Sequence, residues 1–135
     1  MRCVAPGRGT MEEAKPLRGR RILVVEDESL VSMMIEDIVA ELDCIVVGAA
    51  ASAAQAATLV EREALDCAVL DVALAEGQVF PLADVLAARG VPFVFATGYH
   101  PGALDPRYAA VPLVEKPFET GALERALIAA MNRSR

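Results

Sequence analysis

Short runs of apolar, often β-branched residues alternate along this chain with longer segments in which apolar positions recur every three or four residues. The short runs lie at residues 21–25, 44–48, 67–71, 91–96 and 111–115. Each is almost continuously hydrophobic, which is typical of strands buried on both faces of a parallel sheet. The pattern therefore predicts five strands at these positions.

Helical spacing and helix-end signals fill the intervals between these strands. A first helix is indicated by apolar residues at helical spacing, namely Leu30, Met33, Met34, Ile38 and Leu42. Ser52 followed by Gln55 is a capping-box signature, and it predicts an Ala-rich helix that extends to about Ala64. Pro81 suits the first turn of a third helix, which Gly90 would end.

The fourth interval differs from the others. Residues 101–109 contain two prolines and a glycine, so we expect any helix there to be short. A last helix follows, with Thr120 as its predicted N-cap. Its apolar positions are Leu123, Ala126, Leu127, Ala130 and Met131.

Five β–α units in succession predict an α/β fold: a doubly wound, five-stranded parallel sheet of the (βα)5, flavodoxin-like type. Patterning alone does not give the strand order. The order 2-1-3-4-5 would place the first and third strands side by side at a switch point, where ligands bind in such sheets. Residues 1–19 have several prolines and glycines and no apolar period, which predicts a flexible N-terminal arm before one domain at 20–135.

Composition and charge narrow the class of protein. The chain is 55% hydrophobic, enough for a real core, and has a net charge of −6. The first 20 residues hold five basic and two acidic side chains, a net of +3, so the remainder carries −9. A body this acidic argues against nucleic-acid binding, which needs a basic face.

Targeting signals are not evident in the sequence. Residues 1–20 lack the apolar core of a signal peptide, and the longest uncharged stretch, Cys44 to Val60, is interrupted by polar residues. The three cysteines show no metal-binding spacing. These features predict a cytoplasmic protein that does not act on a membrane.

Carboxylates stand where two predicted strands end. Glu26 and Asp27 follow the first strand, and Asp71 closes the third. One such acid would ordinarily be a helix cap or a solvated loop residue. Three that converge would repel one another unless a cation neutralised them, and oxygen ligands with room for water and a phosphate oxygen suit Mg²⁺.

A hydroxyl and an ammonium group stand at the ends of two further predicted strands. Thr97 closes the fourth strand, and Lys116 follows the fifth. A carboxylate, a divalent ion, a hydroxyl and a lysine together suit phosphoryl transfer, in which neutralised charge and positioning supply most of the catalysis. Asp71 is the best candidate for the acceptor, because it stands alone at the end of the central strand.

These residues resemble a receiver domain, the phospho-acceptor module of two-component response regulators, over about residues 20–133. The resemblance rests on Val24-Val25-Glu26-Asp27-Glu28, Val69-Leu70-Asp71, Ala96-Thr97-Gly98 and Glu115-Lys116-Pro117-Phe118. It implies that Asp71 accepts a phosphoryl group from a histidine kinase or a phosphotransfer protein. It also implies a cis Lys116–Pro117 peptide bond.

The resemblance gives roles to the other site residues. Thr97 matches the switch hydroxyl, and Lys116 matches the lysine that pairs with a phosphoryl oxygen. The Mg²⁺ ligands that it implies are Glu26, Asp27, Asp71 and the backbone carbonyl of Ala73.

One departure narrows the resemblance. Receivers usually carry an aromatic switch residue three positions before the lysine, where this chain has Leu113. A tyrosine instead ends Phe95-Ala96-Thr97-Gly98-Tyr99, which resembles the FAT GUY subfamily of alphaproteobacterial receivers. This implies a switching role for Tyr99, the alternative being an ordinary loop tyrosine. It also implies a kinase of the HWE or HisKA2 type.

Since the sequence ends at Arg135, we expect a single-domain response regulator. It would signal by phosphorylation-dependent protein contact or drain phosphoryl groups from another pathway. We do not expect an enzyme, beyond self-phosphorylation and dephosphorylation on Asp71.

Two other classes stay open. A degenerate receiver would bind partners without phosphorylation, although the intact set of acids, threonine and lysine weighs against it. A Mg²⁺-dependent aspartyl phosphatase of the haloacid-dehalogenase type would also use a strand-end aspartate. Such enzymes place a second aspartate two residues later, where this chain has Ala73, and need more chain.

Overall fold

A computed structural model describes residues 15–74, 79–98 and 106–133. It contains one sheet of five parallel strands in the order β2-β1-β3-β4-β5, which confirms the predicted doubly wound fold. The strands are β1 Arg21–Val25, β2 Ile45–Ala50, β3 Cys67–Asp71, β4 Phe93–Thr97 and β5 Leu113–Glu115.

The helices of the described residues connect these strands. They are α2 Ser29–Glu41, α3 Ala53–Arg62, α4 Val79–Ala88, the 3₁₀ turn η3 Pro106–Tyr108, and α5 Thr120–Arg133. Between β4 and β5 only η3 is helical in the part that the structure describes. This agrees with the short helix that the prolines and glycine there predict.

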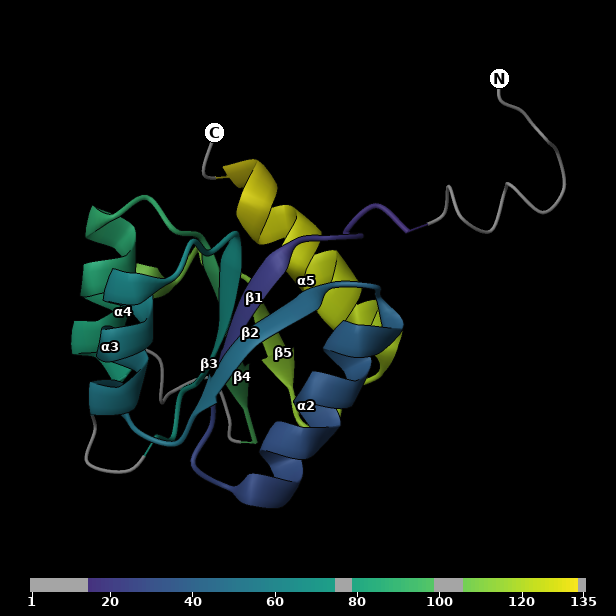
Figure 1. The fold of residues 1–135 in the computed structure, drawn as a ribbon, viewed down its shortest axis with the longest axis horizontal. Coiled ribbons are helices and arrows are strands. Elements are labelled where there is room, and N and C mark those ends of the chain that lie inside the picture. The colour runs from purple at the N-terminus through teal and green to yellow at the C-terminus, as the bar shows by residue number, and fades with distance from the viewer. Residues whose placement is uncertain (1–14, 75–78, 99–105, 134–135) are drawn as a thin grey trace, which may run out of the picture.

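Two layers of helices enclose the sheet. Helices α2 and α5 cover one face and α3 and α4 cover the other (Figure 1). Successive strand residues point to opposite faces, so Ile22 and Val24 of β1 pack on the α2–α5 side. Leu23 and Val25 pack on the α3–α4 side. This explains why the strands read as unbroken apolar runs.

Strands β4 and β5 begin two residues later than the hydrophobic runs predict. The residue just before each strand is a proline, Pro92 before β4 and Pro112 before β5. Proline has no N–H to give to a sheet, so each strand starts after it. The carbonyls of Pro92 and Pro112 still accept hydrogen bonds from the neighbouring strands, at 3.1 and 3.0 Å.

The predicted helix-end signals have different outcomes. The Ser52 hydroxyl accepts a hydrogen bond from the Gln55 N–H at 3.2 Å, and the Gln55 side chain accepts one from the Ala51 N–H at 2.8 Å. The capping box at α3 is therefore confirmed. Thr120, however, is the first residue of α5, and its hydroxyl donates to Glu41 Oε1 at 2.7 Å. It ties α5 to α2.

The end of the predicted N-terminal arm packs on the domain. Leu17 is only 3% exposed in the core between α2, α5 and the sheet, and the Gly19 N–H donates to the Asp43 carbonyl at 2.8 Å. Burying the Leu17 side chain holds this stretch in place. Among the described residues, no helix combines the length and apolar character that crossing a membrane requires.

Candidate functional site

Parallel pairing brings the carboxyl ends of four strands to one edge of the sheet. The residue pairs nearest this edge are Val25–Leu70, Asp71–Ala96 and Thr97–Glu115. Glu26, Asp71, Thr97 and Lys116 therefore lie in one row across β1, β3, β4 and β5. The hydrophobic pattern sets this register, because a slip of one residue would turn each strand's core side chains to the wrong face.

Three carboxylates from β1 and β3 converge at this edge. Glu26 and Asp71 are 2% and 3% exposed, whereas Asp27 is open to solvent. One oxygen of each lies within 4.8 Å of the others. Two buried acids and one exposed acid at this spacing fit a hard divalent cation that keeps some of its water, as Mg²⁺ does. The structure thus brings Glu26, Asp27 and Asp71 together as the sequence predicts.

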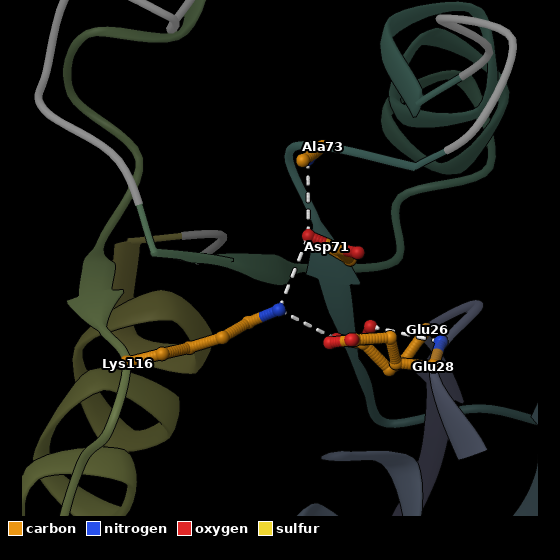
Figure 2. Close-up of polar contacts among 5 residues, drawn as sticks. All are labelled: Glu26, Glu28, Asp71, Ala73 and Lys116. Atoms are coloured by element: carbon orange, nitrogen blue, oxygen red, sulfur yellow. Dashed lines mark hydrogen bonds and ion pairs between the residues drawn. The ribbon is translucent and has the colours of Figure 1, made fainter. Parts of the chain in front are cut away.

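Lys116 reaches between two of these acids, as Figure 2 shows. Its ammonium nitrogen lies 2.7 Å from Glu26 Oε1 and 3.3 Å from Asp71 Oδ1, and its side chain is 16% exposed. The Lys116 N–H also donates to the Thr97 carbonyl at 2.7 Å, which fixes the start of the lysine's backbone against β4. The Lys116–Pro117 peptide bond is cis.

Backbone N–H groups orient the two buried carboxylates. The Glu28 N–H donates to Glu26 Oε2 at 3.1 Å, and the Ala73 N–H donates to Asp71 Oδ1 at 3.0 Å (Figure 2). The Ala73 backbone therefore lies at the site, although its role as a metal ligand through the carbonyl stays a prediction. Within the described residues, Asp71 Oδ2 has no hydrogen bond.

Burial and pairing shift the protonation equilibria of this site. Burial raises the pKa of Glu26, and this outweighs the hydrogen bonds from Lys116 and Glu28 that lower it. Burial of Lys116 favours its neutral form, but the hydrogen bond to Glu26 and the charge of Asp71 outweigh it, so the pKa of Lys116 is raised. Lys116 is therefore a fixed cation at neutral pH.

The two predicted switch residues differ in what the structure describes. Thr97 is 2% exposed at the end of β4, one position beyond the residue that pairs with Asp71. Tyr99 lies outside the described residues, so its switching role stays a prediction. Leu113, at the position where an aromatic was expected, is half-buried against the α3–α4 side of the core.

Sequence reasoning missed two features. The close pairing of Lys116 with Glu26 was not predicted, because the sequence motif gives Lys116 a role toward the phosphoryl group on Asp71. Also missed was a contact between α4 and η3, in which Arg107 Nη1 lies 3.1 Å from Asp84 Oδ1. Their separation along the chain follows no periodicity, so no sequence signal marks them as partners.

Comparisons with known proteins agree with this geometry. Residues 22–128 match the family described as the response regulator receiver domain. The solution structure of SdrG from Sphingomonas melonis Fr1 is similar: it is 42% identical, covers 84% of this chain and 97% of its own, and has a TM-score of 0.75. No significant match was found among curated proteins.

Two further structures are similar. The BeF3-activated conformation of SdrG, from Pseudomonas melonis Fr1, is 43% identical over 82% of this chain and 95% of its own, with a TM-score of 0.74. The receiver domain of the PhyR response regulator from Erythrobacter litoralis is 28% identical over 85% of this chain and 92% of its own, with a TM-score of 0.71.

Proposed function

This chain belongs to the response regulator receiver domain family, and from that premise we propose that it is a single-domain response regulator phosphorylated on Asp71. The observation that carries the proposal is the position of the Lys116 ammonium group, between Asp71 and Glu26, beside the three converging carboxylates. A fixed cation and a cation site flank one buried aspartate, as phosphoryl transfer requires.

In the proposed reaction, Asp71 Oδ2 forms the new bond to phosphorus. Oδ1 already accepts hydrogen bonds from the Ala73 N–H and the Lys116 ammonium group, which leaves Oδ2 as the nucleophile. The phosphorus–nitrogen bond of a donor phosphohistidine breaks, and its electron pair stays on the donor's ring nitrogen. Lys116 then pairs with an oxygen of the aspartyl phosphate.

Glu26, Asp27, Asp71 and the Ala73 carbonyl would hold Mg²⁺. When bound, this ion neutralises negative charge on the phosphoryl group. The acidic residues on their own would repel a phosphodonor, so we propose that the metal is required for transfer. Catalysis is confined to the phosphorylation and dephosphorylation of this chain, which acts on no other substrate.

The proposed donor is a histidine kinase, and an apolar surface lies where it would approach. Leu30, Met33 and Met34 on the first turns of α2 are 80%, 58% and 36% exposed. Met33 lines the same surface depression as Glu26 and Asp27. Exposed, adaptable side chains beside an acceptor site suit a protein partner. We propose that this α2 surface contacts the donor, of the HWE or HisKA2 type.

Similarity to SdrG supports a phosphorylation-dependent output. That protein has a BeF3-activated conformation, and it is 43% identical to this chain. We propose that phosphorylation of Asp71 likewise changes the conformation of this chain, which then contacts a downstream protein or drains phosphoryl groups from another pathway. We propose that the chain belongs to the FAT GUY subfamily, which the motif Phe95-Ala96-Thr97-Gly98-Tyr99 supports, and that it works in the cytoplasm.

The deciding experiment is phosphorylation by a small phosphodonor with Mg²⁺. Intact-mass spectrometry would follow the native chain, Asp71→Asn, and the matched control Asp37→Asn, an exposed acid on α2. We expect one phosphoryl group on the native and control proteins, none when Mg²⁺ is chelated before the donor is added, and none on Asp71→Asn. A native chain that stays unmodified, while a partner still binds it, would favour the degenerate receiver instead.

A further inference from the structure

Four aromatic side chains gather between β4, α4 and η3. The Tyr108 ring packs edge-on against Phe93 and Phe95 of β4, with ring centroids 5.7 and 5.8 Å away. It also stacks on Phe80 of α4, at 6.1 Å and an interplanar angle of 9°. Such pairs contribute beyond their buried area. Tyr108 and the buried Val111 are thus side chains by which the segment before β5 covers the sheet.

Polar contacts with Asp84 of α4 hold Tyr108 in this position. The Tyr108 hydroxyl donates a hydrogen bond to Asp84 Oδ1. Arg107 Nη1 donates to both oxygens of the same carboxylate, at 3.1 and 3.4 Å, and its guanidinium group lies 5.1 Å from the Tyr108 ring centroid. We call Asp84, Arg107 and Tyr108 the Asp84 latch.

The latch lies on the face of β4 to which Thr97 belongs. Alternate strand residues share a face, so Phe93, Phe95 and Thr97 form one row that ends at the phosphorylation site. Phe95 is fully buried and pairs across the sheet with Leu113, at the position where an aromatic was expected. The Tyr108 ring therefore packs against the row of side chains that ends at Thr97. Phe95 is the side chain that lies between Tyr108 and Thr97.

We propose that Tyr108 is the aromatic partner of Thr97 in this chain, and that phosphorylation releases the Asp84 latch. This inference rests on the proposed function of Asp71. When Thr97 is drawn toward the phosphoryl group, the end of β4 shifts and the packing around Phe95 changes. Tyr108 then leaves the three phenylalanine rings, and η3 separates from α4.

The latch is weak enough to serve as a switch. The side chains of Arg107 and Asp84 are 56% and 48% exposed, so solvent screens their ion pair and it contributes little to stability. The Tyr108 ring is only half-buried, and it borders a surface depression of about 400 Å³ that also includes Val111 and Ala110. This depression gives the ring space into which it can move.

The first test follows the Tyr108 ring by NMR in the full chain. Tyr108 and Tyr99 are the two tyrosines, so a Tyr99→Phe variant assigns the ring signals. In the free protein, ring currents from three phenylalanines should displace the Tyr108 signals. We expect them to move toward random-coil positions when beryllofluoride and Mg²⁺ are added. Unchanged Tyr108 signals, with amide signals of Asp71 and Thr97 that do move, would overturn the switch but leave the proposed function intact.

The second test uses linkage between the latch and the site. If the latched state is the inactive one, a variant that weakens the latch should bind beryllofluoride with Mg²⁺ more tightly. We expect a gain of about two- to fivefold for Arg107→Ala, the range that an exposed ion pair provides. Tyr108→Phe, which keeps the ring and removes the hydroxyl, should change affinity in the same direction.

Arg89→Ala is the matched control, since Arg89 is an exposed arginine just after α4, and its backbone N–H donates to the carbonyls of Val85 and Leu86 rather than to the latch. It should bind beryllofluoride as the native protein does. Affinities of Arg107→Ala and Tyr108→Phe equal to that of Arg89→Ala would overturn the inference. If the native chain does not bind beryllofluoride at all, both this inference and the proposed function are wrong. This outcome is therefore distinct from equal affinities among the variants, which overturns the inference alone.

Discussion

Lys116 is held more closely by Glu26 than by the proposed acceptor: its ammonium nitrogen lies 2.7 Å from Glu26 Oε1 and 3.3 Å from Asp71 Oδ1. Glu26 is almost fully buried, so in the metal-free protein the lysine compensates its charge. Each of the two charges is therefore compensated by the other. A variant that removes only one partner leaves the other buried and uncompensated.

We expect Lys116→Met to lower the free energy of unfolding by about 3 kcal/mol in the absence of Mg²⁺, because it leaves Glu26 unpaired. Adding Glu26→Gln should recover most of that loss, since the double variant no longer buries a lone charge. Urea unfolding in a chelator measures both. The control is Arg62→Met, an exposed arginine on α3. Additive effects of the two substitutions would contradict the pairing.

Lys116→Arg should separate folding from signalling. A guanidinium group keeps the positive charge beside Glu26. It is larger and planar, however, so it does not fit where the compact ammonium group of Lys116 lies. We expect a folded protein that is still phosphorylated but shows little of the phosphorylation-driven conformational change. NMR of the beryllofluoride complex measures this. Partner binding equal to that of the phosphorylated native chain would contradict it.

Because Glu26, Asp27 and Asp71 converge, we expect bound Mg²⁺ to stabilise the folded protein. Binding to the native state alone raises stability by mass action, so millimolar Mg²⁺ should raise the Tm of the native chain. Asp27→Asn should weaken Mg²⁺ binding by at least about tenfold, since it removes the exposed ligand of the cluster. Asp37→Asn serves as the control. Calorimetric titration that detects no binding to the native chain would exclude the site.

The strand-end acids and Lys116 were predictable because their positions depend on local rules. Unbroken apolar runs define the strands, and once the order 2-1-3-4-5 is chosen, Glu26, Asp71 and Lys116 must meet at one edge. Hydrophobic patterning alone did not give the order, since many orders bury the same runs equally well; it was chosen because it brings the acids at the ends of the first and third strands together at a switch point. The site was therefore foreseen through its motifs and the fold through its periodicity.

The Asp84 latch was not predictable for a physical reason. Asp84 lies on the exposed side of an amphipathic helix, and Arg107 and Tyr108 lie in a segment rich in glycine and proline, where periodicity gives no orientation. Only tertiary packing around Phe95 brings them together. The burial of Leu17 has the same cause, because one apolar residue among prolines and glycines shows no pattern.

The thiols of the core are predicted to be unreactive. Burial raises the pKa of Cys67 to about 12, and burial followed by the charge of Asp43 raises the pKa of Cys44 to about 11. The thiolate is the reactive form. In a Cys3→Ser background at pH 8, labelling should therefore require unfolding. Labelling of the native protein as fast as in urea would contradict this.

The same shifts predict how stability depends on pH. The native thiols keep their protons above 9.0, their ordinary pKa, while the unfolded chain loses them there. The native state then binds more protons, so stability is fully present below about pH 9 and falls as pH rises further. Urea midpoints at pH 8 and pH 10 measure the decline. We expect it to be smaller in Cys67→Ala, and an equal decline would contradict the assignment.

The α2 surface gives a prediction about the donor. Leu30 and Met33 are exposed on the first turns of α2, and Met33 lines the same depression as Glu26 and Asp27. Neither side chain contributes a group to the chemistry. Leu30→Ser and Met33→Ser should each lower kcat/KM for transfer from a histidine kinase by about tenfold, which is the loss of more than 1 kcal/mol that an interface hot spot shows.

Phosphorylation of the same variants by a small phosphodonor should be unchanged, because such a donor needs the site and not the surface. Val85→Ser is the matched control: Val85 is 42% exposed, but it lies on α4, on the opposite face of the sheet from α2. If Val85→Ser slows transfer as much as Leu30→Ser does, general loss of apolar surface explains the effect. If Leu30→Ser and Met33→Ser slow the small-donor reaction as well, these residues act on the site itself, and the docking assignment is wrong.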